Sequence, residues 1–363
     1  MNKDKTITAG QAGAMCFFVV LANKILVLPS LLAEKTKAEA IFVPIVLFLF
    51  EFLMIFFFFR LKKRFSNLSF SEIVRRSCGK WASVLMSVLF VLFFLSKAVL
   101  LYNIMHIFLK NVVYHEEDSL VYFVCFIPVV THMAISGLRV MGRTMQIFLP
   151  IILVVFAFVV VVGFTGIVKI PVFFESTPSM FFSTTFSHIS VFGDSVFLFL
   201  IMDKIEIKEG EFKKIFLPTL ISAVFVCLIN IIFVLSYSYT AFMHPYAFFE
   251  MVSFVKEYGG LGRLDIIPMV VIIIISYFQL SLYMKFFMMA FCDVFDKVGD
   301  VLSAVVFDFF FLFLVNFVVL TSSRTILYGE VFLPYISIVP YVIVPILSIV
   351  GLLSKRRILE ADR

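Results

Sequence analysis

The sequence is poor in charged residues and in glycine. Of its 363 residues only 15% are Asp, Glu, Lys or Arg, whereas a soluble domain carries about a quarter. There are 15 glycines, and no G-x-x-x-x-G-K-[ST] pattern that would cradle a phosphate. The H-E-x-x-H and G-x-S-x-G signatures are missing as well. We therefore expect neither nucleotide hydrolysis nor peptidase or esterase chemistry, and we predict that the chain is not an enzyme.

Cysteine is scarce, and the five cysteines are scattered without a C-x-x-C pair. The sequence therefore predicts no disulfide framework, no metal site and no cofactor. The net charge of +6 and the pI of about 9.0 raise the question of nucleic-acid binding. The basic residues lie beside the ends of apolar runs, however, and no basic module with interleaved aromatic residues is present. No nucleic-acid partner is expected. The cysteines are Cys16, Cys78, Cys125, Cys227 and Cys292.

Apolar residues are abundant instead. They make up 62% of the chain, Phe alone contributes 50 residues, and the mean hydropathy is +1.11. About 20 apolar residues in helical form cross a hydrocarbon core of about 30 Å, whereas barrel strands would alternate apolar and polar residues, which these runs do not. We predict an all-α membrane protein with ten transmembrane helices. The expected spans are 8–32, 40–60, 82–110, 119–137, 145–167, 181–203, 214–242, 264–291, 299–322 and 333–353.

Lysine and arginine are concentrated on one side of these spans. The loops after the second, fourth, sixth and eighth spans, together with the two ends of the chain, carry most of the 30 basic residues. Cytoplasmic loops are enriched in Lys and Arg. We therefore expect both termini in the cytoplasm, which requires an even number of spans. The chain is predicted to be a multi-pass integral protein of the lipid bilayer, with residues 1–363 forming a single domain.

Two segments between the spans predict short helices at the membrane surface. Ser69 and Glu72 have the spacing of a capping box, and Gly79 follows as a helix stop. Between the seventh and eighth spans, the amphipathic stretch Phe248–Tyr258 is expected to form an interfacial or re-entrant helix on the outer face.

Two of the apolar runs contain a charged residue near a residue that breaks helices. In the first span, Lys24 lies near mid-membrane and precedes Pro29, which removes a backbone hydrogen bond. In the sixth span, Gly193 stands beside Asp194. A charged side chain at the bilayer centre costs about 3 kcal/mol on insertion scales, so such residues are functional candidates. We predict that both spans are interrupted helices.

The two interruptions lie five spans apart. Interrupted helices at corresponding positions of two halves indicate an inverted-repeat fold with a ligand site at the midplane; here the halves would be about 8–167 and 181–353. If the first and sixth helices are neighbours, Lys24 and Asp194 can form an ion pair that lowers the cost of burying each charge. The alternative is that Lys24 extends towards the membrane surface and Asp194 caps a half-helix without touching a ligand.

Further polar residues within the spans allow two interpretations. They could line an interior path, or they could satisfy one another's hydrogen bonds. His188, near the sixth-span interruption, is a candidate proton carrier, although a hydrogen-bonded packing role also suits a lone histidine. The other residues are Glu51, Lys97, Asn103, His106, Tyr277, Gln279, Tyr283 and Lys285.

Short segments along nearly the whole chain carry a resemblance to a known family. They are Ile25-Leu26 with Leu28-Pro29-Ser30, Ser71-Glu72-Ile73 with Cys78-Gly79-Lys80, Gly137-Leu138-Arg139-Val140 with Arg143-Thr144, Phe148-Leu149-Pro150-Ile151, Phe192-Gly193-Asp194 and Arg263-Leu264-Asp265. In this order and spacing they resemble the spore-germination permeases. These are the B subunits of nutrient germinant receptors, within the amino acid–polyamine–organocation superfamily.

The resemblance implies a LeuT-like fold, a 5+5 inverted repeat of ten helices in which helices 1 and 6 are interrupted. It also implies that an amino acid or similar small nutrient binds between helices 1, 3, 6 and 8, and that germinant receptor A and C subunits are partners in the spore inner membrane or cell membrane. The chain departs from the family at Asn23 and Lys24, where small glycine-type residues are usual, and at Asp194, where Glu is usual.

We therefore expect a permease-like subunit of a nutrient germinant receptor that binds an amino acid or similar germinant and signals germination. A proton-coupled amino acid transporter with the same fold is the alternative. A structural membrane subunit or a water or ion conduit is a third possibility. The residues expected to contact the ligand are Asn23, Lys24, Ile25, Lys97, Ser190, Gly193, Asp194 and Tyr277.

Overall fold

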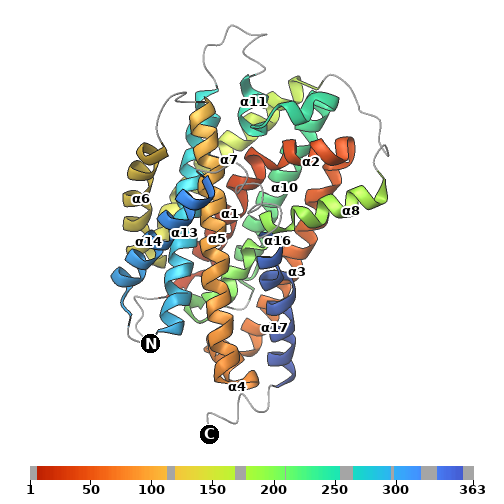
Figure 1. Ribbon diagram of the computed structural model, residues 1–363. Coiled ribbons are helices and arrows are strands. Elements are labelled where there is room, and N and C mark those ends of the chain that lie inside the picture. Colours follow the sequence, from red (N-terminus) through yellow and green to blue (C-terminus); the bar gives the residue numbers. More distant parts are fainter. Residues whose placement is uncertain are drawn as a thin grey trace.

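The computed structural model describes residues 6–112, 119–167, 177–208, 210–253, 265–295, 298–319 and 333–354 (Figure 1). Within these ranges the chain is almost entirely helical. The two-residue strands β1 (Ile7–Thr8) and β2 (Ile205–Glu206) pair in parallel. The expected all-α membrane class is confirmed by several apolar helices that are long enough to cross a membrane.

The helices of the first half are α1 (Ala9–Leu26), α2 (Leu28–Thr36), η2 (Lys37–Ile41), α3 (Phe42–Arg64), α4 (Phe70–Cys78), α5 (Lys80–Val112), α6 (Ser119–Ile135) and α7 (Leu138–Thr165). The sixth expected span follows as α8 (Pro178–Ser187), η3 (Ile189–Val191), η4 (Asp194–Val196) and α9 (Phe197–Leu200), and then η5 (Met202–Lys204). The remaining helices are α10 (Lys213–Tyr237), η6 (Ser238–Met243), α11 (Ala247–Ser253), α13 (Ile266–Val294), α14 (Asp300–Val319), α16 (Leu333–Ile336), the π-helical turn η8 (Val339–Ile343) and α17 (Val344–Leu353).

Eight stretches of the described chain are long and apolar enough to cross a membrane. The first two differ from the expected spans, because α1 ends at Leu26 and the next stretch runs from Leu28 through Arg64. Two expected spans fall outside the eight. One is α6, which has 17 residues, and the other is the sixth span, which is divided among short helices. The count of ten transmembrane helices therefore stays a prediction.

Helix α1 lies at the centre of the molecule and packs against α10, α7 and α13. It is buried over almost its whole length, as expected of a helix that is apolar on all sides. Gly13 allows the close approach of α10, because a Cβ atom at this position would lie 2.0 Å from the carbonyl oxygen of Lys214. Small residues at helix contacts are typical of membrane proteins, where packing rather than water expulsion drives association.

The outer helices present large apolar side chains away from the protein. On α7, Val154 is 70% exposed and Ile147 is 68% exposed; on α14, Phe309 is 67% exposed. A soluble monomer rarely exposes contiguous apolar surface of this kind. These faces are therefore suited to contact with lipid.

Short helices are present in both segments where surface helices were expected. The hydroxyl of Ser69 accepts a hydrogen bond from the backbone N–H of Glu72 (3.2 Å) at the start of α4, and Gly79 ends the helix with a φ of +97°. The second helix, expected at Phe248–Tyr258, begins as α11 at Ala247 and is described to Ser253; its remainder lies outside the described residues.

Candidate functional site

The first and sixth apolar runs are both interrupted, as predicted. Helix α1 ends at Leu26, and α2 begins at Leu28 with Pro29 in its first turn. Proline suits this position, because the first N–H groups of a helix have no intrahelical acceptor. In the sixth run, α8 ends at Ser187, and the chain passes through η3 and an extended Phe192 before η4 begins.

Gly193 makes the second interruption possible. Its φ is +84°, in the left-handed region that L-residues other than glycine adopt at a cost. A Cβ atom here would also lie 2.7 Å from Cγ of Pro340, so η8 packs directly on the glycine backbone. Both observations require glycine at this position.

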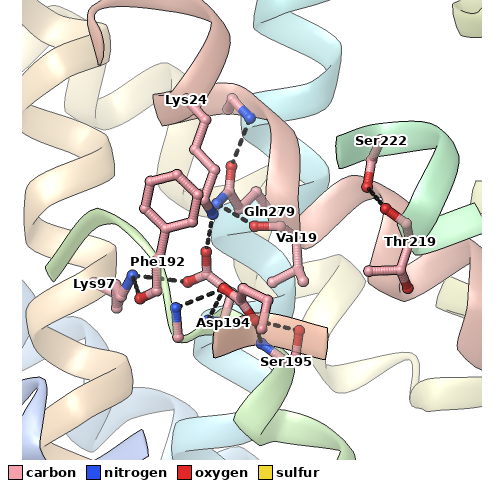
Figure 2. A network of polar contacts seen from close by, with 12 residues as sticks. Val19, Lys24, Lys97, Phe192, Asp194, Ser195, Thr219, Ser222 and Gln279 are labelled. Carbon is pink, nitrogen blue, oxygen red and sulfur yellow. Dashed lines mark hydrogen bonds and ion pairs between the residues drawn. The ribbon is translucent and has the colours of Figure 1, made fainter. Parts of the chain in front are cut away.

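Lys24 and Asp194 form an ion pair that joins the two interruptions (Figure 2). The side chains are 1% and 0% exposed, respectively. The ammonium of Lys24 also lies over the ring of Phe192, 4.8 Å from its centroid. The predicted pairing is thus confirmed, and Lys24 does not extend to the membrane surface. The charge of Lys24 is neutralised inside the protein, where an unpaired ammonium would be costly.

A second lysine, Lys97 of α5, binds the same carboxylate. Its Nζ lies 2.9 Å from Oδ1 of Asp194 and donates a hydrogen bond to the carbonyl oxygen of Phe192 at 2.7 Å. Lys97 therefore holds both a side chain and a backbone group of the interrupted segment, as Figure 2 shows.

Glu51 of α3 binds the backbone of the same interruption. Its Oε1 accepts hydrogen bonds from the N–H groups of Gly193 (2.6 Å) and Asp194 (3.1 Å). Its Oε2 accepts from the N–H of Ser195 (3.2 Å) and from the Ser195 hydroxyl. Backbone N–H groups at the start of a helix have no intrahelical acceptor, so the carboxylate replaces the missing partners.

Two polar residues of α13 complete the network. The hydroxyl of Tyr283 donates to Oδ1 of Asp194 at 2.8 Å, and the side-chain amide of Gln279 donates to the Tyr283 oxygen at 2.6 Å. The same amide also donates to the carbonyl of Val19 (2.7 Å), and its oxygen accepts from the N–H of Ala22 (3.2 Å). Gln279 thereby connects α13 to the backbone of α1 just before its interruption.

The formal charges of Lys24, Lys97, Glu51 and Asp194, which we call the four-charge cluster, sum to zero. All four side chains are buried, and each is bound by at least one charged or backbone partner. Removal of one partner from a buried ion pair costs about 3–5 kcal/mol, because the other charge is left uncompensated. The cluster therefore couples four elements, α1, α3, α5 and η4, through charges that cannot be changed singly without penalty.

The structure places the other expected ligand residues as follows. Asn23 and Ile25 flank Lys24 and are buried, and Ser190 is buried in η3. Oδ1 of Asn23 has no hydrogen-bond partner among the residues that the structure describes. Tyr277 lies outside the network and stacks on Phe126 of α6, with ring centroids 4.1 Å apart. Helix α13 reaches Asp194 through Tyr283, not through Tyr277.

Three members of the network were noted in the sequence only as polar residues within spans. Glu51 is the one acid within the second expected span, and Gln279 and Tyr283 are four residues apart, so they share one face of α13. These signals identify interior-facing side chains but not their partners. His188, the candidate proton carrier, lies at the end of α8, and its Nδ1 is 2.9 Å from the carbonyl oxygen of Thr184.

Comparison with known proteins identifies the family. No curated protein matches the sequence. The family model described as spore germination protein, a spore permease family, matches residues 6–326. This match includes α1, α3, α5 and the interrupted sixth segment, and therefore every member of the four-charge cluster. The chain belongs to the spore germination protein family of permeases.

Proposed function

We propose that the chain is the permease-like subunit of a nutrient germinant receptor, and that an amino acid or similar small germinant binds at the four-charge cluster. Membership of the spore germination protein family supports a role in germination. The observation that carries the site is the Lys24–Asp194 ion pair, because it connects two interrupted helices that are 170 residues apart in the chain.

Signalling would follow from a change in this pairing. A ligand shifts a conformational equilibrium only if it binds one state better than the other. Lys24 belongs to α1 and Asp194 to η4, so a ligand that alters their contact changes the relative stability of two positions of these elements. Helix α1 packs against α7, α10 and α13, which gives such a movement a path to the rest of the protein.

The proposed architecture is a LeuT-like 5+5 inverted repeat of ten transmembrane helices, with halves of about 8–167 and 181–353. The Lys24–Asp194 ion pair, which joins the two interrupted segments, supports this architecture. In such folds the interrupted helices of the two halves surround the ligand site. We further propose that the termini are cytoplasmic, and that germinant receptor A and C subunits read the signal at the spore inner membrane. No catalytic step is required.

A proton-coupled amino acid transporter is the second candidate. It is favoured by the two buried carboxylates of the cluster, Glu51 and Asp194, because acidic residues buried within transmembrane segments often belong to proton pathways. Both candidates use the same site. They differ in whether the ligand crosses the membrane.

Two measurements on the purified chain in lipid separate these functions. Equilibrium binding of radiolabelled amino acids in nanodiscs tests for the site, and uptake into proteoliposomes with an imposed pH gradient tests for transport. Saturable binding without uptake supports the receptor subunit. Concentrative uptake supports the transporter, and the absence of both contradicts amino acid binding altogether.

A further inference from the structure

We infer that the ligand is a zwitterion that inserts into the Lys24–Asp194 ion pair: its ammonium replaces Lys24 on Asp194, and its carboxylate binds the released Lys24. In the unliganded protein the ammonium of Lys24 thus occupies the position that the ligand's ammonium takes on Asp194. When the ligand binds, Lys24 pairs with the ligand's carboxylate. The inference rests on the proposed function and adds the charge class of the ligand and the way in which it is held.

The charge balance of the cluster selects the ligand class. Two ammonium groups and two carboxylates already cancel in a region closed to solvent, where Lys24 is 1% exposed and Asp194 0% exposed. A ligand with a net charge would leave one charge uncompensated in this environment, which is strongly unfavourable. A zwitterion keeps the sum at zero and gives each of its own charges a partner. An amine without a carboxylate would release Lys24 with no anion to receive it.

The contacts also indicate which lysine exchanges. Lys97 is held twice by the interrupted segment, through Oδ1 of Asp194 (2.9 Å) and the carbonyl of Phe192 (2.7 Å). Tyr283 donates to the same Oδ1 at 2.8 Å. Lys24 binds the other oxygen, Oδ2, and its second contact is the face of the Phe192 ring. Oδ2 therefore exchanges its partner while Oδ1 keeps Asp194 in place.

An unused acceptor lies beside Lys24. Asn23 is 3% exposed, and its Oδ1 has no donor in the described part of the chain. A buried acceptor without a donor destabilises the unliganded protein, whereas an arriving ammonium brings three N–H donors. The unpartnered oxygen of Asn23, one residue before Lys24, is therefore an acceptor available to one of these donors. This second, independent observation also favours a ligand that carries an ammonium group.

The inference can be tested by measuring how the wild-type chain in nanodiscs binds sets of ligands whose members differ in their charged groups. The probes are L-alanine, L-valine, L-leucine and L-phenylalanine, each with its decarboxylated amine and its deaminated acid. We expect at least one amino acid to bind about tenfold or more tightly than both of its analogues, since each analogue leaves a buried charge unpaired. An amine or acid that binds as tightly as its amino acid would overturn the insertion but leave the proposed function intact. If no member of any series binds, the inference and the proposed function both fail.

Charge-changing variants give a second readout. Lys24→Gln leaves the cluster with a net negative charge, and its preference should move from the amino acid to the amine. Asp194→Asn leaves a net positive charge, and its preference should move to the acid. Asp300→Asn, which lies outside the cluster and contacts Lys285, should keep the wild-type order. If both cluster variants keep the wild-type order of affinities for amino acid, amine and acid, the inference is contradicted. If a variant does not fold, the ligand series on the wild-type chain tests the inference.

Discussion

Oε1 of Glu51 lies 2.6 Å from the backbone nitrogen of Gly193, so an acid of α3 holds the interrupted segment by its main chain. The same carboxylate binds the next two N–H groups, those of Asp194 and Ser195. Leu49, two positions before Glu51 and so on the opposite side of α3, is 64% exposed. A single turn of this helix thus faces lipid on one side and fixes the geometry of the charge cluster on the other.

Glu51→Gln should therefore destabilise the folded protein. Glutamine keeps one acceptor oxygen but loses the charge and the second acceptor, and each hydrogen bond to a charged group contributes about 1.5–3 kcal/mol. Thermal unfolding of the purified chain in nanodiscs should show a lower Tm. Glu211→Gln, at an exposed turn where Glu211 binds Lys214, is the control and should shift Tm little. Equal effects of the two substitutions would contradict the role given to Glu51.

The Lys24–Asp194 pair can be tested by a double-mutant cycle. Lys24→Met alone should cost about 3–5 kcal/mol, because it leaves an excess buried negative charge. The double variant with Asp194→Asn restores a neutral cluster and should be less destabilised than the sum of the single variants. The matched control is Lys285–Asp300 at 3.1 Å, in which Asp300 is 59% exposed; its coupling should stay below about 1 kcal/mol. Additive effects at Lys24 and Asp194 would show that the two charges are not coupled.

Gly193→Ala should separate backbone conformation from packing. Gly193 and Gly210 have φ values of +84° and +82°, but a Cβ atom at Gly210 meets nothing within 4 Å, whereas at Gly193 it meets Pro340. The left-handed conformation costs an alanine about 1–2 kcal/mol at either position. Gly193→Ala should lower Tm clearly more than Gly210→Ala, because it also displaces η8. Similar losses at both positions would mean that the contact with Pro340 is unimportant.

Asn23→Leu should stabilise the unliganded protein and weaken ligand binding. A buried acceptor without a partner destabilises the folded protein by about 1–3 kcal/mol. The substitution removes such an acceptor, because Oδ1 of Asn23 has no partner among the described residues. Asn230 is the contrasting case. Its Oδ1 also has no partner among the described residues, but its Nδ2 donates a hydrogen bond to the carbonyl oxygen of Ala40 at 2.8 Å. Asn230→Leu loses that bond and should lower Tm. A lower Tm for Asn23→Leu, with unchanged amino acid binding, would remove Asn23 from the site.

The sequence predicted the ion pair because its signals are local. Lys24 and Asp194 are charges within apolar runs, and each lies near a proline or a glycine, residue types that interrupt helices. The interruption in the first run was expected around Pro29, but α1 ends at Leu26 and the break lies at Val27. Proline is favoured in the first turn of a helix, so Pro29 lies just after the start of α2 and not at the end of α1.

The sequence alone does not predict which groups bind the members of the cluster. Glu51 binds main-chain N–H groups, and no residue type at positions 193–195 signals such a contact. On α13, Tyr277 was expected at the site, but Tyr283 contacts Asp194. This helix is apolar on nearly all sides, so its hydrophobic pattern does not fix its rotation. The tertiary packing of α13 against α5 and α1 determines which tyrosine faces inward.

Germination of spores tests the central claim most directly. Spores that carry the wild-type chain, Asp194→Asn or Asp300→Asn should be compared at equal membrane levels of the chain, with the fall in optical density after addition of an amino acid mixture as the readout. The account predicts that Asp194→Asn abolishes the response or shifts it to deaminated acids, and that Asp300→Asn germinates normally. A wild-type response from Asp194→Asn spores would contradict a germinant site at the Lys24–Asp194 ion pair.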